Sequence, residues 1–593
     1  MVKILGINAY HADAAASLII DGKIINSAEE ERFTRIKHCA GFPVKAIDWC
    51  LNDANIQLKD LDHISINTNP KAHIIKKFAY VVRRKPNPFF IFDRLINKRE
   101  RVNLKKVFKE NFGNQTIKAK FHFVEHHKCH LASAFFASSF NNALVISVDG
   151  FGDFASCAVG IGNNNTLSIL DYVFFPHSLG AYYTAMTQFL GFPNFGDEYK
   201  VMGLAPYGNP KYMNEMREII KLKRNGKYEL NLSYFNHATK RIPNQWSQGY
   251  PIIGKHYSDK LVNLLGKDRS PKEAINQFHK DIAASVQLMY EEAFFNILNY
   301  FYRKYPQKNI CIAGGCGANS VANGKITKRT PFSKVFVQAA SGDAGGALGS
   351  AMSIWHDLSN QRIKPMGPSY LGQKFSDKNV SDFFSSKNII NQLSKLNATL
   401  IKLGDEGLRD EKSFLELVVN FIEKGAVVGW FEGRMEWGPR ALGHRSILCD
   451  PRRSDMKKIL NLKIKKRESF RPFAPSVLKE FAKDWFDFGS EEDQEVPYMM
   501  KVLPIKNEKR HLIPAVCHVD GTGRLQTVTE KENGRYYKLI KCFHEKTSIP
   551  MLLNTSFNEN EPIVCNISEA FNCFKRTNMD MLVVEKFIIA RNI

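Results

Sequence analysis

The first third of the chain repeats one alternation of apolar and polar positions. Residues 3–28, KILGINAYHADAAASLIIDGKIINSA, are predicted to form a strand, an acid at Asp13, a second strand, a tight turn and a third strand. Residues 144–170, LVISVDGFGDFASCAVGIGNNNTLSIL, follow the same order, with acids at Asp149 and Asp153 and an asparagine-rich turn. An alternation with a period of two, interrupted by turn residues, predicts a hairpin in each segment.

Two copies of a strand–acid–hairpin unit predict a two-lobed domain with a cleft between the lobes. Actin, hexokinase and the heat-shock chaperones share this architecture, and nucleotides and metals bind in such clefts. We therefore expect an α/β protein with an actin- or hexokinase-like N-terminal domain.

Two further segments combine a strand, a glycine-rich loop and a helix. They are KNICIAGGCGANSVANGKI at 308–326 and KVFVQAASGDAGGALGSAM at 334–352. Glycines let the backbone approach a phosphate, and a following helix N-terminus favours an anion. The alternative is that these glycines only make tight turns and close helix packing. The tandem favours nucleotide binding, with these candidate residues: Gly314, Gly315, Gly317, Asn319 and Gly345.

The segment FVEHHKCHLASAFF at 123–136 carries two histidines four residues apart, His126 and His130. If the small apolar residues after them continue as a helix, both imidazoles lie on one face and can reach a single ion. The glutamate of the HExxH zinc-protease motif is absent. Taken alone, such a pair is more often ordinary helix residues. Asp343, in the second glycine loop, could complete a site that suits iron(II), zinc or manganese.

The pattern lapses around 360–410, and we place a domain boundary near 365, giving domains 1–365 and 366–593. The second domain has its own alternation of strands and helices. Its segment 426–453 is a strand that leads into an arginine-rich loop, and a helix is expected near 454–464. Residues 550–564, PMLLNTSFNENEPIV, form a buried strand that ends in polar residues.

Four basic residues of the second domain stand in loops rich in glycine, proline and phenylalanine: Arg440, Lys465, Arg471 and Arg524. Glycine, proline and phenylalanine interspersed among the basic residues imply a fixed, partly buried backbone. Guanidinium forks and the point charge of lysine suit phosphate groups, and Asn554 and Ser556 can hydrogen-bond an acyl or phosphate oxygen. We favour an anionic-ligand pocket over a solvated charged face.

Composition and charge narrow the class of protein. The chain has 593 residues, is 44% hydrophobic and carries a net charge of +24, which attracts polyanions. Much of the excess lies in 71–106, for which an amphipathic helical insertion with a solvated basic face is favoured over a nucleic-acid or membrane surface. Eleven scattered cysteines without a CxxC pair indicate a reducing compartment. With no signal peptide and no apolar run long enough to span a bilayer, we expect a cytoplasmic protein.

Several ordered motifs identify a family resemblance over essentially the whole chain. They are HHKCHLASAFFASSF, NFGDEYKVMGLAPYG, AGGCGANSVANGKI, SGDAGGALGSA, GRMEWGPRALGHRSIL, KKRESFRPFAPS, DGTGRLQTV and LLNTSFNENEPIV. The sequence resembles the O-carbamoyltransferases typified by the nodulation-factor, cephamycin and tobramycin carbamoylating enzymes. Gly317, His444 and the basic segment 71–106 depart from the pattern, and the last of these leaves the acceptor open.

The resemblance implies the fold and the reaction. The N-terminal domain is similar to the tRNA threonylcarbamoyl-transfer enzyme, and the C-terminal domain to the synthase that makes threonylcarbamoyl-AMP. Carbamoyl phosphate and ATP, with Mg²⁺, would react in the C-terminal domain to give carbamoyladenylate and pyrophosphate. A hydroxyl of a small-molecule acceptor would then attack the adenylate in the N-terminal domain.

The resemblance also implies roles for residues. The phosphates and the carbamoyl group would be held by Arg440, Lys465, Arg471, Arg524, Asn554 and Ser556, with Lys465 and Arg471 also catalytic. A metal, iron(II), would be held by His126, His130 and Asp343, with Asp149 close to it. His11 and Asp13 follow the first strand at the cleft, and either could help to deprotonate the acceptor hydroxyl.

Two other functions stay open at this point. A tRNA-carbamoylating enzyme would explain the net charge, although the motif set is that of enzymes for small molecules. A non-catalytic ATP-binding regulator would not need the arginine, lysine and NTSFN sets. We expect a small-molecule alcohol, ATP and carbamoyl phosphate as partners, and no specific nucleic acid. The oligomeric state is left open, a homodimer included.

Overall fold

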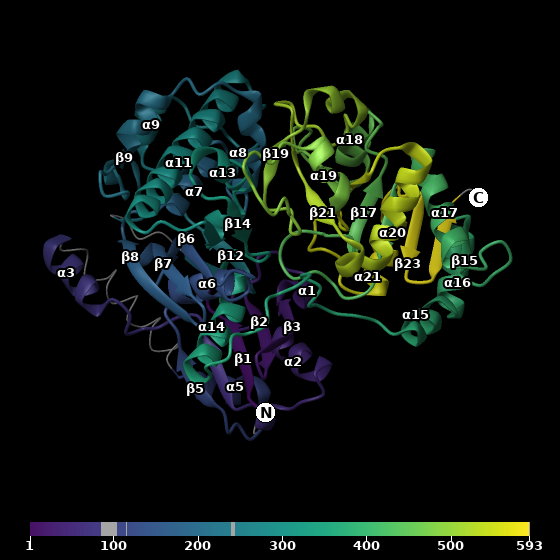
Figure 1. The fold of residues 1–593 in the computed structure, drawn as a ribbon, viewed down its shortest axis with the longest axis horizontal. Helices are drawn as coiled ribbons and strands as arrows, with labels where there is room; N and C mark the ends of the chain where they lie inside the picture. The colour runs from purple at the N-terminus through teal and green to yellow at the C-terminus, as the bar shows by residue number, and fades with distance from the viewer. Residues whose placement is uncertain (85–102, 114, 239–243, 592–593) are drawn as a thin grey trace. The chain divides into compact units, whose positions relative to one another are not determined.

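The computed structural model describes residues 1–84, 103–113, 115–238 and 244–591. Part of the basic segment predicted to be helical, 85–102, lies outside the described residues. The described chain forms two compact units (Figure 1). Unit 1 comprises Met1–Ala322 and Ile326–Met366, and unit 2 comprises Asn323–Lys325 and Gly367–Ile593.

The first sheet of unit 1 begins with an antiparallel meander of β1 (Lys3–Asn8), β2 (Ala15–Ile20) and β3 (Lys23–Glu29). Two parallel strands, β4 (His63–Ile66) and β5 (Lys120–Phe123), extend it beyond β1. The resulting order is β3-β2-β1-β4-β5. The turn between β2 and β3 holds a left-handed residue at Asp21.

The second sheet has the same topology. Its meander is β6 (Asn142–Gly152), β7 (Ala155–Asn163) and β8 (Thr166–Phe174). The parallel strands β13 (Asn309–Ala313) and β14 (Lys334–Val337) extend it in the order β14-β13-β6-β7-β8. The predicted repeat of a strand–acid–hairpin unit and the two-lobed α/β fold are therefore confirmed.

Two helices pack tightly in unit 1 between these strands, α6 (His126–Phe135) and α14 (Asp343–Leu358). A methyl group on Gly349 of α14 would lie 1.8 Å from the carbonyl oxygen of Cys129 on α6. One on Gly6 of β1 would lie 2.0 Å from the carbonyl oxygen of Ala347. These glycines thus permit α14 to lie close to α6 and to β1. The close packing holds α6 and α14 beside each other.

The remaining elements of unit 1 lie in the connections between the strands of the two sheets. The longest is α11 (Gln277–Lys304), a largely buried helix. The others are α1 (Glu31–Thr34), α2 (Val44–Asp53), η1 (Leu58–Asp60), α3 (Ile74–Arg84), α5 (Leu104–Phe112), α7 (Leu179–Phe189), α8 (Glu198–Leu204), η2 (Ala205–Tyr207), α9 (Met213–Ile219), β9 (Ile220–Leu222), β10 (Tyr228–Leu230), η3 (Leu232–Tyr234), β11 (Asn244–Ser247), β12 (Tyr250–Ile253), α10 (Asp259–Leu265), η4 (Gly315–Ala318), α12 (Ser320–Asn323) and α13 (Ile326–Arg329).

Unit 2 is built on one mixed eight-stranded sheet in the order β15-β24-β23-β16-β17-β22-β18-β21. These strands are β15 (Ala398–Lys402), β16 (Val428–Phe431), β17 (Arg445–Cys449), β18 (Ala474–Leu478), β21 (Gln526–Val528), β22 (Met551–Ser556), β23 (Met581–Val584) and β24 (Phe587–Arg591). A small two-stranded sheet joins β19 (Val502–Pro504) to β20 (Thr522–Arg524).

The helices of unit 2, apart from η6, bury apolar side chains in a single core with the large sheet. They are α15 (Asp377–Phe384), α16 (Lys387–Lys395), α17 (Glu411–Glu423), α18 (Met456–Ile459), the π-helix η5 (Leu460–Ile464), α19 (Lys479–Trp485), η6 (Asn507–Leu512), α20 (Glu530–Thr547) and α21 (Ile567–Arg576). The predicted helix near 454–464 and the buried strand ending at Ser556 are both present. None of the helices in the described part of the chain combines the length and the apolar character that crossing a bilayer requires.

Candidate metal and anion sites

Helix α6 carries both histidines of the motif and begins at the first of them. The side chain of Glu125 caps it, accepting hydrogen bonds from the backbone N–H groups of His127 and Lys128. His126 and His130 stand one turn apart and are 1% and 0% exposed. Between them, His127 turns away and its Nδ1 lies 2.5 Å from the hydroxyl of Ser147. The helical spacing therefore directs two imidazoles, and not the third, to one point.

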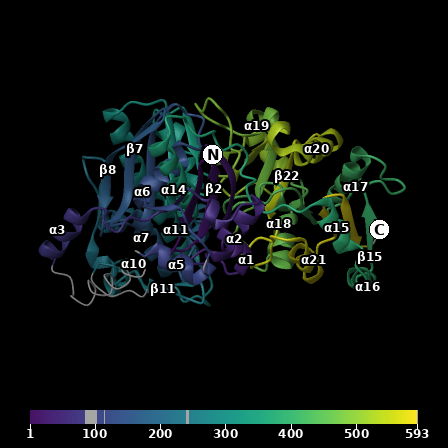
Figure 2. The same ribbon diagram turned by 90° about the horizontal axis from the view of Figure 1, so that it is seen from below.

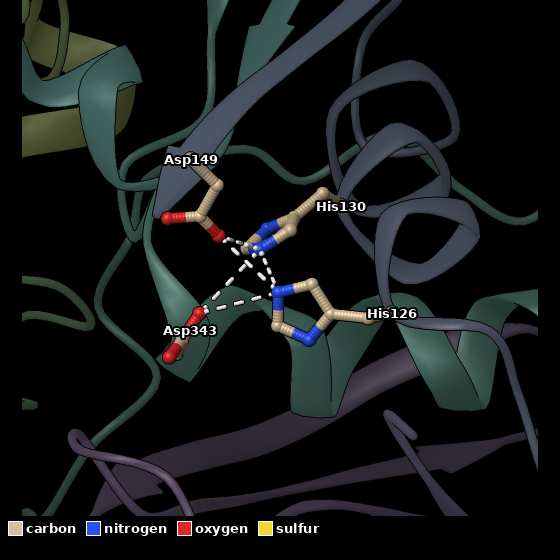
Figure 3. A group of neighbouring side chains, drawn as sticks. All are labelled: His126, His130, Asp149 and Asp343. Carbon is tan, nitrogen blue, oxygen red and sulfur yellow. Dashed lines mark hydrogen bonds and ion pairs between the residues drawn. The ribbon is translucent and has the colours of Figure 1, made fainter. Parts of the chain in front are cut away.

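Two carboxylates meet these imidazoles, forming the histidine–aspartate cluster His126, His130, Asp149 and Asp343 (Figure 3). Asp149 extends from β6, and its Oδ2 lies 3.2 Å from Nε2 of His126 and 2.8 Å from Nε2 of His130. Asp343 is the first residue of α14, and its Oδ1 lies 3.5 Å from each Nε2. The two Nε2 atoms are 3.1 Å apart.

The electrostatics of the cluster follow from this convergence. Burial alone would lower the pKa of His126, but its hydrogen bond with Asp149 and the charge of Asp343 raise that pKa to about 10. Burial alone would raise the pKa of Asp149, but hydrogen bonds from His126 and His130 hold it well below its usual range. For Asp343, burial and the nearby charge of Asp149 raise the pKa. The carboxylates and imidazoles thus hold protons between them. A divalent cation bound at this point would displace those protons.

The chemistry and space at this point fit a transition metal. Two imidazole nitrogens and two carboxylate oxygens lie within 4.8 Å of one another, a donor set that suits iron(II), zinc or manganese. The N–H of Gly315 donates to Oδ1 of Asp149, which leaves Oδ2 directed at the imidazoles. A methyl group on Gly152 would lie 2.0 Å from Cδ2 of His126, so this glycine leaves room for the ring.

The two predicted proton-transfer residues have different surroundings. The ring of His11 lies 5.6 Å from that of His126, which places His11 beside the cluster. Asp13 has a left-handed backbone with a φ of 56° and accepts a hydrogen bond from Nδ1 of His38 at 2.8 Å. Burial would lower the pKa of His38, but the charge and hydrogen bond of Asp13 raise it to about 9. Sequence reasoning missed His38.

The predicted glycines of the first loop have two kinds of role. Gly314 has a φ of +87°, and a methyl group there would lie 2.2 Å from the carbonyl oxygen of Val148, so the turn requires glycine. A methyl group on Gly315 would lie 2.9 Å from Oδ1 of Asp149. Gly317 is less constrained, with Ser341 at 3.2 Å from such a methyl group. The loop therefore brings its backbone against β6 and the carboxylate of Asp149.

Asn319 and Gly345 take part in packing and capping. The side chain of Asn319 exchanges two hydrogen bonds with Gln287 and accepts one from the N–H of Ala322. A methyl group on Gly345 would lie 2.1 Å from the carbonyl oxygen of Ala340, so Gly345 serves the close turn into α14. Their assignment to nucleotide binding stays a prediction.

In unit 2, the described residues include a cluster of four guanidinium groups, which we call the arginine cluster: Arg440, Arg467, Arg471 and Arg524. Arg524 lies on β20, Arg440 between β16 and β17, and the other two follow η5. Burial, and then the charges of the other three arginines, lower the pKa of Arg524 well below its usual range. Arg471 has an acid 3.5 Å away, in Glu468. Mutual repulsion at this place would be relieved by an anionic ligand.

Lys465 and Ser556 are in direct contact in unit 2. Lys465 is 1% exposed, and its Nζ donates to the carbonyl oxygens of Ser556 and Asn558 and to Oδ1 of Asn558 at 2.7 Å. Ser556 Oγ lies 3.3 Å from the same Nζ and donates to Asn558 Oδ1. Lys465 therefore joins the turn after η5 to the loop after β22.

Asn554 lies at the centre of a buried polar network. Its amide NH₂ donates to Ser476 Oγ at 3.0 Å, to Gln526 Oε1 at 3.3 Å and to the carbonyl oxygen of Ala441 at 3.2 Å. Gln526 in turn donates to the carbonyl oxygen of Leu442. The network holds Arg440's loop, which contains residues 441 and 442, against β22.

Comparison with known proteins then decides the family. A family model for the carbamoyltransferase N-terminus matches residues 3–352, and one for the carbamoyltransferase C-terminus matches residues 419–591. The chain belongs to the carbamoyltransferase family. Its resemblance to the O-carbamoyltransferases, seen first in the motifs, is confirmed, and the protein is a carbamoyltransferase enzyme.

Named relatives of this carbamoyltransferase span much of its length. An uncharacterized protein of Synechocystis sp. is 40% identical over 100% of this chain and 97% of the relative. Nodulation protein NolNO of Sinorhizobium fredii is 34% identical over 98% of this chain and 80% of the relative. The 3'-hydroxymethylcephem-O-carbamoyltransferase of Streptomyces clavuligerus is 27% identical over 66% of this chain and 65% of the relative.

Proposed function

We propose that this carbamoyltransferase is ATP-dependent and transfers a carbamoyl group to a hydroxyl of a small-molecule acceptor. The name of the Streptomyces relative describes O-carbamoylation of a hydroxymethyl group on a small molecule, which supports the acceptor class. The observation that carries the ATP-dependent step is the arginine cluster of unit 2. Burial and then the charges of three other guanidinium groups lower the pKa of Arg524, and four such groups suit the phosphates of two anionic substrates.

The first half-reaction belongs to unit 2 in this proposal. Carbamoyl phosphate and ATP give carbamoyladenylate and pyrophosphate. Water first cleaves carbamoyl phosphate to carbamate and inorganic phosphate. A carbamate oxygen then attacks the α-phosphorus of ATP, which forms carbamoyladenylate and displaces pyrophosphate. Arg440, Arg471 and Arg524 hold phosphate oxygens, and Lys465 fixes the loop that carries Ser556 beside them. Asn554 orients the carbamoyl group through its buried amide.

The second half-reaction belongs to unit 1. A carbamoyl carbon is a poor electrophile because its nitrogen donates into the carbonyl, and adenylation gives it a good leaving group. A divalent metal held by His126, His130, Asp149 and Asp343 would stabilise negative charge on the departing AMP phosphate. Asp13 accepts the proton of the acceptor hydroxyl, and His38 fixes one of its oxygens so that the other is directed to the acceptor. His11 lies beside the metal cluster and orients the reactants there.

The test is the dependence of pyrophosphate release on both substrates. We expect the wild-type protein to release pyrophosphate from ATP only when carbamoyl phosphate is present. Added hydroxylamine should trap the carbamoyl group as hydroxyurea, detected by mass spectrometry. Pyrophosphate release at the same rate without carbamoyl phosphate would contradict the adenylate route. So would the absence of pyrophosphate release under any condition.

The acceptor is tested separately with a panel of small alcohols and with tRNA. We expect a mass gain of one carbamoyl group on an alcohol and none on tRNA. Carbamoylated tRNA would instead favour the nucleic-acid-modifying alternative that the net charge of +24 suggests.

A further inference from the structure

Helix α3 exposes large apolar side chains along one face. Ile74, Ile75, Phe78 and Val82 are 54%, 82%, 71% and 58% exposed. Their spacing of three and four residues places them on one side of the helix. Apart from the N-terminal methionine, Ile75 and Phe78 are the most exposed large apolar side chains in the described part of the chain. The sequence pattern predicted a solvated basic face for this segment, and the structure adds an apolar stripe to it.

The opposite face of α3 is the one that packs. The ring of Tyr80 lies edge-on to Phe154 and Phe175, with centroids 5.7 Å and 5.2 Å away. Lys76 lies over the ring of Phe174. Figures 1 and 2 both show α3 projecting from its unit on the side of β8. The helix thus rests on the end of the second sheet by one face and presents the other outward.

The base of α3 is firmly attached. Asp153 accepts hydrogen bonds from the hydroxyl of Thr68 and from the N–H of Asn69, at 2.8 Å and 2.7 Å. His73 lies 3.6 Å from Glu125, the residue that caps α6. The segment that leads into α3 is therefore tied to the β6–β7 turn and to the cap of α6.

The charged residues of α3 and of the segment just before it are all basic. Between Lys71 and Arg84 the sequence has five lysine or arginine residues and no aspartate or glutamate. Of these, Lys71, Lys76 and Arg83 are exposed on or beside α3. The acids at the base of the helix, Glu125 and Asp153, are already engaged by His73, Thr68 and Asn69. An aliphatic stripe rimmed by cations matches an anionic lipid surface, which accepts the apolar side chains at its acyl boundary and the cations at its headgroups.

We propose that α3 docks this carbamoyltransferase onto an anionic membrane surface. A nucleic acid would pair with the same lysines and arginine but would leave Ile74, Ile75 and Val82 in water, since aliphatic side chains neither stack on bases nor pair with phosphates. The docking is peripheral, because an eleven-residue helix cannot cross a bilayer. It is independent of the carbamoyl-transfer reaction.

The test is co-sedimentation of the full chain with vesicles of phosphatidylcholine alone or mixed with phosphatidylglycerol. We expect binding to the anionic vesicles and little to the neutral ones. Ile75→Ser with Phe78→Ser should weaken binding at least about tenfold, because two large apolar side chains no longer enter the lipid. Lys71→Gln with Arg83→Gln should weaken binding about tenfold on anionic vesicles and change nothing on neutral ones.

Matched variants elsewhere control for general loss of apolar area or charge. Ile390→Ser removes another isoleucine that is 48% exposed, and Lys378→Gln with Lys412→Gln removes two exposed cations. Both should bind vesicles like the wild type, and thermal melting checks that every variant is folded. Absence of wild-type binding to anionic vesicles would overturn the proposal. So would binding that survives the Ile75/Phe78 change, or an RNA duplex that binds more tightly and responds only to the charge variants.

Discussion

Opposite charges meet in the histidine–aspartate cluster of unit 1, whereas like charges meet in the arginine cluster of unit 2. In the first, Asp149 and the imidazoles of His126 and His130 stabilise one another's charged forms. In the second, the charged form of half-buried Arg524 is destabilised by burial and by the charges of three other guanidinium groups. The first cluster pairs acids with bases. The second brings cations together, and a bound polyanion would lower their mutual repulsion.

The largest effect should come from reducing the repulsion in the arginine cluster. Arg524→Gln removes a phosphate partner, and we expect pyrophosphate release to fall by about 10²-fold or more, as when a single preorganised donor is removed from an active site. The same change should raise the melting temperature of the substrate-free protein, because the remaining arginines repel one another less. Sulfate should stabilise the wild type more than the variant.

Arg453→Gln is the matched control for Arg524→Gln. Arg453 forms an exposed ion pair with Asp455 at 2.7 Å, so its loss should change neither pyrophosphate release nor the response to sulfate. A lower melting temperature for Arg524→Gln, or unchanged pyrophosphate release, would show that the arginine cluster is structural.

Removing a residue of the histidine–aspartate cluster should lower the melting temperature, whereas removing Arg524 should raise it. His130→Ala leaves two buried carboxylates without one of their partners, so we expect a lower melting temperature as well as loss of bound metal, measured by elemental analysis. His127→Gln on the same helix is the control, because His127 bonds to Ser147 and should not affect metal content. Stoichiometric metal in a His126/His130 double alanine variant would exclude the metal site.

A pair of glycines tests whether space around the cluster matters. Gly152→Ala places a methyl group 2.0 Å from the His126 ring, whereas Gly150→Ala meets no atom within 4 Å. We expect Gly152→Ala to reduce metal affinity by about 10-fold or more, the range seen when the surroundings of metal ligands are disturbed. Gly150→Ala should keep full metal content. Equal metal content in both variants would mean that His126 is free to move.

The smallest effect concerns the ion pair of His38 and Asp13. The pKa of His38 is raised to about 9, so the pair stabilises the fold fully below about pH 6.5 and loses that contribution as the pH rises through about 9. The pair is about one-third exposed, which limits its contribution to about 1 kcal/mol. The melting-temperature difference between wild type and His38→Gln should shrink across this pH range. Rates of carbamoyl transfer from preformed adenylate should fall in the same variant and show a shifted pH profile. A difference in melting temperature that is constant with pH would contradict the ion pair.

Sequence reasoning succeeded where a local pattern fixes geometry. The four-residue spacing of His126 and His130 determines that they share a helical face. The strand–acid–hairpin unit that occurs twice in the first third of the chain predicted a two-lobed domain, which the structure builds on two sheets of the same topology. Asp343 was predicted because a glycine loop precedes a helix, and the structure places it in the first turn of α14.

The residues that were missed depend on the tertiary fold. His38 comes 25 residues after Asp13 in the sequence. No hydrophobic periodicity indicates that its loop folds back beside the first strand. In KIKKRESFRP the sequence singled out Lys465 and Arg471 but not Arg467, whose charge acts on Arg524 in the folded chain. For α3, the sequence showed an amphipathic helix, but only the packing of Tyr80 shows which face is buried and that Ile75 and Phe78 face outward.

The central claim is that adenylate formation and carbamoyl transfer use the two clusters separately. The most direct measurement supplies preformed carbamoyladenylate, with an accepted alcohol, to Arg471→Ala and to His130→Ala, and quantifies the carbamoylated product by mass spectrometry. We predict that Arg471→Ala transfers at close to the wild-type rate, whereas His130→Ala transfers little, although it still releases pyrophosphate from carbamoyl phosphate and ATP. Loss of transfer in Arg471→Ala together with full transfer in His130→Ala would contradict the account.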